Sequence, residues 1–156
     1  MELEKQNFRS NIFALQAGMI GMIERGEMTT ANMRLKHYFC PTPDGRFIYA
    51  RELWVAKESV IVGKIHRFPC LNFLTLGKIA VATEEGTQVL TAPYTFVAPA
   101  GVKRAGTIIE DTIWTTVHLT EYGSEADLDK IENEVIAPNF AEIDRAAALR
   151  LKEHNL

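Results

Sequence analysis

Basic and aromatic side chains recur two residues apart in three segments of the chain. These positions are Tyr49 and Arg51, Lys64 and His66, and Trp114, Thr116 and His118. Because successive side chains of a strand point to opposite faces, each group shares one face if its segment is a strand. Arginine binds phosphate or carboxylate oxygens with two parallel hydrogen bonds, and aromatic rings offer stacking surfaces for a base. The groups therefore predict a pocket for an anionic ligand that contains a ring.

A further arginine, Arg104, follows the turn residue Gly101, and we expect its side chain in the same lumen. The predicted lumen contains Arg51, His66, Arg104, Trp114 and His118. Each residue also has a structural explanation: Arg51 can pair with Glu52, and Trp114 and His118 can belong to the core. Arg104 is the hardest to explain structurally, and the convergence of the whole set favours a binding site.

Other kinds of chemistry have weaker support. No serine lies in a Gly-x-Ser-x-Gly turn, and the two Gly-Lys-Ile segments lack the rest of a phosphate-binding loop. Cys70 follows His66 by four residues, so a continuous strand would place both on one face but too far apart for a direct hydrogen bond. Glu110 and Asp111 are adjacent and would point to opposite faces. No acid–base pair of carboxylates is expected from them.

The middle of the chain, from Leu35 to Leu119, has the pattern of consecutive strands. Runs rich in β-branched and aromatic residues alternate with turn residues at intervals of about 8–12 residues. The clearest runs are 47–55, 60–66, 73–77, 78–83 and 107–119. This spacing, without any helical period, is typical of an all-β sandwich or barrel.

Both ends of the chain are expected to be helical, within residues 1–30 and 124–153. An apolar stripe with helical spacing is formed by Phe8, Ile12, Leu15, Met19 and Met22. This stripe must be covered, either by the chain's own barrel or by the same helix of a second subunit. Near the other end, Ser124 is a natural N-cap, Pro138 ends that helix, and Asn139 begins another.

Three segments carry a family resemblance: VGKIHRFPCLNFLTLGKIAVAT (62–83), APYTFVAPAGVKRAG (92–106) and EDTIWTTVH (110–118). The first contains a strand that leads to Gly77, and the second contains Pro99 and Gly101 followed by Arg104. They resemble the two halves of a cupin barrel. With YARE before and DLDKIENEVIAP after, the pattern is similar to small cupin-like proteins encoded by tailed bacteriophages. Over residues 35–138, the resemblance implies a jelly-roll barrel. Together with the helices expected at both ends, the predicted fold is mainly β, a cupin-like jelly-roll barrel with an N-terminal helix and two short C-terminal helices.

The resemblance also implies where a metal would bind. Metal-binding cupins use His-x-His, a glutamate four residues later, and the histidine of the second motif. Alignment on Gly77 places Lys64, His66, Cys70 and Arg104 at these positions. Two cations among the ligands would repel a divalent ion, so we expect no bound metal and no other cofactor. A set made of His66, Cys70 and His118 stays open as an alternative.

Composition narrows the functional class. The chain has 156 residues, of which 47% are hydrophobic and 24% charged, as in one soluble globular domain spanning 1–156. A net charge of −3 argues against binding to duplex nucleic acid. The two cysteines, Cys40 and Cys70, form no disulfide framework and indicate a reducing cytoplasm. The apolar run from Ile12 to Ile23 is too short to span a membrane, and its mixed-charge flank is unlike a secretion signal.

Three functional hypotheses follow. The first is a non-catalytic barrel that captures a small anionic, nucleotide-like ligand; the phage resemblance implies a counter-defence protein that sequesters a host signalling nucleotide. The second is a cupin-type isomerase or lyase for a sugar or nucleotide sugar, with His66 or His118 as base. The third is a virion or assembly scaffold. We favour the first, and we expect a homo-oligomer, most simply a dimer.

Overall fold

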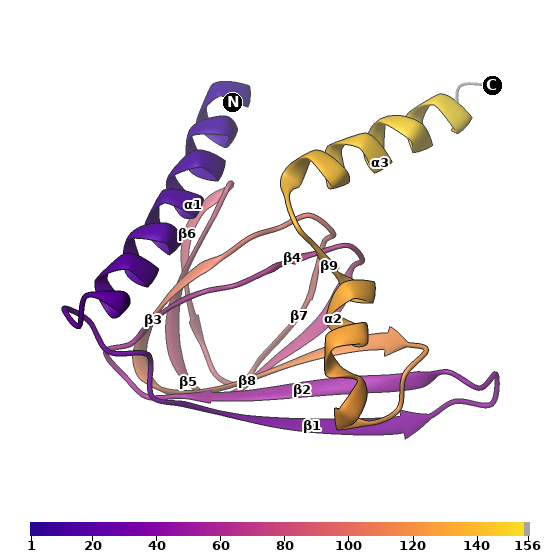
Figure 1. Cartoon of the computed structure of the whole chain (residues 1–156), viewed down its shortest axis with the longest axis horizontal. Helices are drawn as coiled ribbons and strands as arrows, with labels where there is room; N and C mark the ends of the chain where they lie inside the picture. The colour runs from indigo at the N-terminus through magenta and orange to yellow at the C-terminus, as the bar shows by residue number, and fades with distance from the viewer. Residues whose placement is uncertain (155–156) are drawn as a thin grey trace.

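A computed structural model describes residues 1–154 of the chain and the side chains of residues 1–150. Helix α1 spans Glu2–Glu24, and the strands that follow are β1 Met33–Pro41, β2 Phe47–Val55, β3 Val60–Val62, β4 Ile65–His66, β5 Cys70–Thr83, β6 Gly86–Thr91, β7 Tyr94–Ala98 and β8 Ala105–Thr120. A 3-10 turn at Glu125–Asp127 then leads to α2 Leu128–Val135, β9 Ile136–Ala137 and α3 Phe140–His154. The predicted class, mainly β with helices at both ends, is confirmed (Figure 1).

Two long strands, β5 and β8, form the centre of the barrel. The sheet order is β1-β2-β8-β5-β6; β3 also pairs with β8 and β7 with β5, while β4 and β9 form a separate pair. The first half of β5 pairs with β7 and the second half with β6, so β5 contributes to both ends of the barrel. Figure 1 shows β1, β2 and β8 on one side, with α1 and α3 on the other.

The run 60–66, expected as one strand, is divided, because the Gly63 N–H donates to Arg104 O over 2.8 Å and its carbonyl accepts from Lys103 Nζ over 2.7 Å. These bonds to the loop before β8 separate β3 from β4. In contrast, the runs 73–77 and 78–83 belong to one strand, β5, which begins earlier, at Cys70.

Gly77 allows β5 to continue through an irregular region. The register between β5 and β8 shifts on both sides of Gly77, whose φ is +86°. A β-carbon at this position would lie 2.1 Å from Asp111 O. Only glycine fits this close backbone approach in a left-handed conformation.

The apolar core has three parts. The largest fills one end of the barrel and consists of Val55, Leu74, Ile79, Val81, Leu90 and Ile108. Tyr49 packs with Ile131 and Val135 beneath α2, and Ile65 packs with Ala137 and Phe140 where α3 begins. The C-terminal segment therefore closes the other end of the barrel with its own apolar side chains.

Ser124 and Asn139 both accept capping hydrogen bonds as predicted, but Ser124 caps the 3-10 turn Glu125–Asp127 and not α2, whose N-cap residue is Asp127. Ser124 Oγ accepts from Ala126 N over 3.2 Å, and Asn139 Oδ1 accepts from Glu142 N over 3.1 Å. Between the two helices the chain pairs as β9 with β4, next to His66. Arg67 strengthens this junction, because its N–H donates to Val135 O and its guanidinium bonds to Glu142.

Helix α1 docks on its own barrel through only part of its apolar stripe. Ile12 is buried and Phe8 and Met19 are half-buried, whereas Leu15 and Met22 are exposed. Arg9 completes the docking with two ion pairs. Its guanidinium lies 2.6 Å from Glu84 in the β5–β6 turn and 2.8 Å from Asp144 in α3, so it links α1 to both elements.

Within the part of the chain that the structure describes, no helix is both long and apolar enough to cross a membrane.

Candidate functional site

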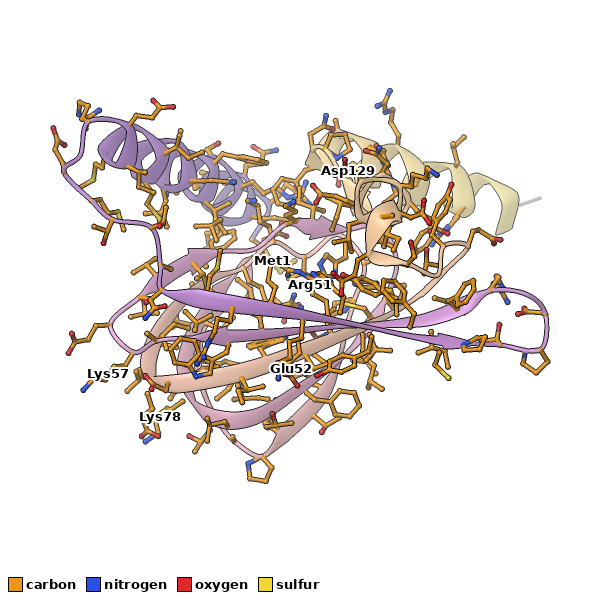
Figure 2. The ribbon with its side chains drawn as sticks, turned by 60° about the horizontal axis from the view of Figure 1, so that its bottom comes forward. Met1, Arg51, Glu52, Lys57, Lys78 and Asp129 are labelled. Carbon is orange, nitrogen blue, oxygen red and sulfur yellow. The ribbon has the colours of Figure 1, made fainter. Side chains whose placement is uncertain are left out.

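Strand register brings polar side chains from five strands into adjacent rows on the inner face of the barrel. Residues that are directly opposite in antiparallel strands share a face. One row consists of His37, Arg51, Thr116, Asn72 and Phe96. In the next row Tyr49 is opposite His118, and Cys70 is opposite Ala98. The rows place the predicted residues Arg51 and His118 on the same side of the sheet, and Figure 2 shows Arg51 and Glu52 on opposite faces of β2.

Asn72 lies at the centre of these rows. Its side chain is 2% exposed, and its Oδ1 accepts from Trp114 Nε1 at 2.9 Å and Thr116 Oγ1 at 3.1 Å. Its Nδ2 donates to Cys70 O at 3.0 Å and lies 3.5 Å from Cys70 Sγ. The sequence analysis missed this residue. An asparagine in the apolar run CLNFLTL was the available signal, since a polar residue inside such a strand needs buried partners.

His66 and Cys70 are in direct contact. His66 Nδ1 lies 3.0 Å from Cys70 Sγ. The expectation that these side chains are too far apart is wrong, because β4 ends at His66 and the chain turns before β5 begins at Cys70. The turn allows residues four apart to meet, which a continuous strand does not.

His118 completes a cluster of three potential donors. Its ring is 9% exposed and lies edge-on to the His66 ring, with centroids 4.8 Å apart. The ligand atoms of His66, Cys70 and His118 all lie within 4.8 Å of one another. Among the described side chains, the His118 ring has no hydrogen-bond partner, so its nitrogens are available to a molecule in the lumen.

Both histidines are held in the neutral form. Burial, together with the charges of His118, Arg104 and Arg51, lowers the pKa of His66 to about 3. Burial and the charge of Arg51 lower the pKa of His118 to about 4. Burial also raises the pKa of the Cys70 thiol. At neutral pH the cluster therefore carries two imidazoles and a thiol, and the positive charge around it belongs to the arginines.

The loop between β7 and β8 positions Arg104 beside this cluster. Gly101 N–H donates to His66 O over 2.8 Å, so the loop is fixed to β4. The Arg104 guanidinium lies 5.7 Å from the centre of the Phe96 ring. Burial lowers the pKa of Arg104. Among the described side chains, the guanidinium has no carboxylate partner. A partly buried cation without a counter-charge is costly, and a bound anion would remove that cost.

Arg104 also lines a cavity of about 170 Å³. Its other walls include the aromatic rings of Tyr94 and Phe96 and the acidic side chains of Glu84 and Glu85. Phe96 in turn packs edge-on against Trp114 at 5.6 Å. Arg104 therefore connects the cavity to the cluster of His66 and Cys70, whose pKa values its charge affects.

The remaining predicted residues lie outside this centre. Lys64 is exposed and forms an ion pair with Glu132, because only Ile65–His66 is strand and the alternation does not extend back to residue 64. Tyr49 is buried under α2, and its hydroxyl lies 2.8 Å from His37 Nδ1. Trp114 lies at the inner face, where its indole N–H donates to Asn72. Its ring packs against Phe96 and so supports the cavity wall that Phe96 forms.

Comparison with known proteins identifies the architecture. No protein-family model matches the chain, and no curated protein sequence matches it. Ectoine synthase from P. lautus superposes with a TM-score of 0.50 and 11% identity, over 67% of this chain and 75% of its own. A cupin domain from Bordetella pertussis Tohama I gives 0.45 and 14%, over 60% and 98%. The chain has a cupin fold. KdgF from Halomonas sp. gives 0.46 and 18%, over 60% and 83%.

The cupin resemblance implies four metal-ligand positions in the barrel. The corresponding positions hold Lys64, His66, Cys70 and Arg104, and Lys64 is engaged with Glu132. The different set formed by His66, Cys70 and His118 offers nitrogen and sulfur donors that suit a zinc-like divalent ion. Two donors of that set are on the cupin motif, and the third comes from the far end of β8.

Proposed function

We propose that the cupin barrel binds a small anionic ligand that contains a ring, and that Arg104 holds its anionic group. The observation that carries this proposal is the Arg104 guanidinium, which is partly buried, lines a cavity and lacks a carboxylate partner among the described side chains. Arg51, on the inner face near His118, adds positive charge. An anion would neutralise this field with charge-assisted hydrogen bonds.

The surroundings of Arg104 support a ring on the ligand. Tyr94 and Phe96 form one wall of the cavity, with ring centroids 5.6 Å apart. Neutral His66 and His118 present donors or acceptors toward the lumen without adding charge. Nucleotide-like molecules are one class that combines an anion with a ring, and capture without turnover is the activity that these features support.

Replacement of Arg104 tests the anion site. Loss of a bidentate, charge-assisted contact costs about 1.5–3 kcal/mol, so Arg104→Ala should weaken binding roughly ten- to a hundredfold. The affinity of Arg104→Lys should be intermediate, since lysine keeps the charge but cannot form the two parallel hydrogen bonds of a guanidinium. Native mass spectrometry of the purified protein would reveal a copurifying ligand and its loss. Arg34→Ala is the matched control, because Arg34 stacks on Trp54 at the strand pair β1–β2, away from the cavity.

Unchanged ligand retention in Arg104→Ala, with the fold intact by circular dichroism, would refute the proposal. His66→Ala separates binding from turnover. A sequestering protein would lose only affinity, whereas an enzyme that uses His66 as a base would lose turnover and still bind substrate.

A metal-dependent enzyme is the second candidate, favoured by the proximity of His66, Cys70 and His118. These residues would hold the ion, which would supply Lewis-acid chemistry to a ligand anchored at Arg104. Elemental analysis after incubation with zinc, iron or nickel salts tests this candidate. About one ion per chain, lost in Cys70→Ser and kept in Arg104→Ala, would support it; no retained ion would refute it.

A further inference from the structure

The cavity beside Arg104 has an uneven distribution of charge. Arg104 is its one cationic lining residue among the described side chains, and it is partly buried. The two acidic lining residues, Glu84 and Glu85, come from the turn between β5 and β6. The other lining residues are aromatic, aliphatic or uncharged. The lining therefore attracts one negative charge through Arg104 and repels further negative charge through the two glutamates.

The two glutamates differ in how far their charge is compensated. Glu84 is paired with Lys5 at 3.5 Å and Arg9 at 2.6 Å, both from α1. Glu85 is exposed, and its carboxylate has no ion pair among the described side chains. Glu85 is consequently the main source of uncompensated negative potential at the turn.

From this layout we propose that the site selects ligands with a single anionic group on a planar ring and discriminates against dianions and polyphosphates. The inference rests on the proposed anion site at Arg104 and adds its selectivity. Glu85 is the specificity-determining residue, because its carboxylate, unpaired among the described side chains, lines the same cavity and would repel a second anionic group on the ligand. Like charges about 12 Å apart near a protein surface repel enough to weaken binding by about tenfold.

The size of the cavity leads to the same class of ligand. Its volume of about 170 Å³ is below the roughly 300–1,000 Å³ of pockets that enclose drug-sized ligands. A single six-membered ring with one carboxylate fits such a space, whereas a nucleoside triphosphate is too large to be enclosed. This refines the nucleotide-like ligand to a smaller aromatic or heterocyclic monoanion.

A charge series on one ring tests the selectivity. Benzamide, benzoate and terephthalate share a ring and carry zero, one and two negative charges, and terephthalate places its second carboxylate opposite the first. Dissociation constants from protein NMR titration should show benzoate binding best and terephthalate roughly tenfold weaker. Uridine triphosphate should not bind at concentrations that half-saturate the protein with benzoate.

Glu85→Gln provides the site-specific control. It should strengthen terephthalate binding several-fold and leave benzoate within about twofold. Glu24→Gln removes the same charge fifteen residues beyond Arg9 on α1, about 22 Å along the helix, and should change neither constant.

The outcomes separate the two proposals. If anions bind and lose affinity in Arg104→Ala, but terephthalate or uridine triphosphate binds as tightly as benzoate, the selectivity inference is wrong and the anion site stands. If benzoate, terephthalate and uridine triphosphate all fail to bind, the anion site is refuted, and its selectivity with it.

Discussion

Single residues in the lumen combine neutral polar groups with isolated positive charge. The Asn72 amide forms hydrogen bonds with the Trp114 and Thr116 side chains and with the Cys70 carbonyl. It therefore holds these side chains in place on the inner face without adding charge. His66 and His118 stay neutral through burial and the nearby arginines. This arrangement leaves Arg104 as the cation that lines the cavity, while Arg51 adds positive charge near His118. Anion binding should therefore depend on the arginines rather than on histidine protonation.

The neutral histidines predict a loss of stability in mild acid. Their folded-state pKa values, about 3 for His66 and about 4 for His118, lie below the ordinary 6.5. Between pH 6.5 and 4 the unfolded chain binds more protons than the folded one, so the free energy of unfolding falls as pH falls. From pH 7 to 5 each histidine should contribute a loss on the order of 1–2 kcal/mol, measured by urea unfolding.

His118→Gln is the control for this dependence. It should flatten the slope of stability against pH by about half, whatever its effect on stability at pH 7. A wild-type protein equally stable at pH 7 and 5 would contradict the prediction and show that the two rings are not buried as neutral groups.

The sequence pattern suggested candidate residues for the site but did not predict their contacts. His66 and His118 were predicted from residue type and strand alternation, and Arg104 from its place after Gly101; the structure brings the His66 ring within 4.8 Å of the His118 ring. Lys64 was misplaced because alternation was extended back beyond Ile65, where β4 begins. Asn72 was missed because its role depends on cross-strand partners more than forty residues away. Such long-range pairing is not readable from one strand.

At the scale of elements, short irregular segments determine where the functional groups lie. The chain turn before β5 brings Cys70 to His66, and the Gly101 loop brings Arg104 beside both. Gly101 has φ of +79°, and a β-carbon there would lie 2.6 Å from Ile143 of α3. Strand β2 was predicted with its observed ends, 47–55, because turn residues bound it on both sides. The irregular segments were not predicted, since their conformation depends on contacts between elements that are far apart in the sequence.

The bulge at Gly77 gives a test at this scale. Gly77 and Gly45 have the same φ of +86°, but a β-carbon at Gly45 has no atom within 4 Å. Gly45→Ala should cost only the left-handed strain, about 1–2 kcal/mol. Gly77→Ala adds a collision with the Asp111 carbonyl and should cost at least about 3 kcal/mol in urea unfolding. Equal losses would show that β5 and β8 separate easily and that the bulge does not restrain the barrel.

For the whole molecule, apolar surface remains exposed in two regions. On α1 the exposed large apolar residues are Leu3, Phe13, Leu15, Ile20 and Met22. On the outer face of the sheet, register aligns Tyr38, Ala50, Val117, Leu71 and Val97, of which Tyr38, Leu71 and Val97 are exposed. Strand β1 ends the sheet order, with β2 as its one neighbour among the described strands. Uncovered edges and apolar rows of this kind favour association with a second copy.

We therefore expect a homodimer at micromolar concentration, observed by sedimentation as about twice the 17.5 kDa chain mass. Charged substitutions distinguish the two surfaces, since a lysine buried in an apolar interface is costly. Tyr38→Lys should produce monomers if the sheet forms the interface, and the pair Leu15→Lys and Met22→Lys should do so if α1 does. Both variants leave the cavity intact, so benzoate binding should persist in the monomer. A wild-type monomer at these concentrations would overturn the expectation, and both surfaces would then be solvent-facing in the working protein.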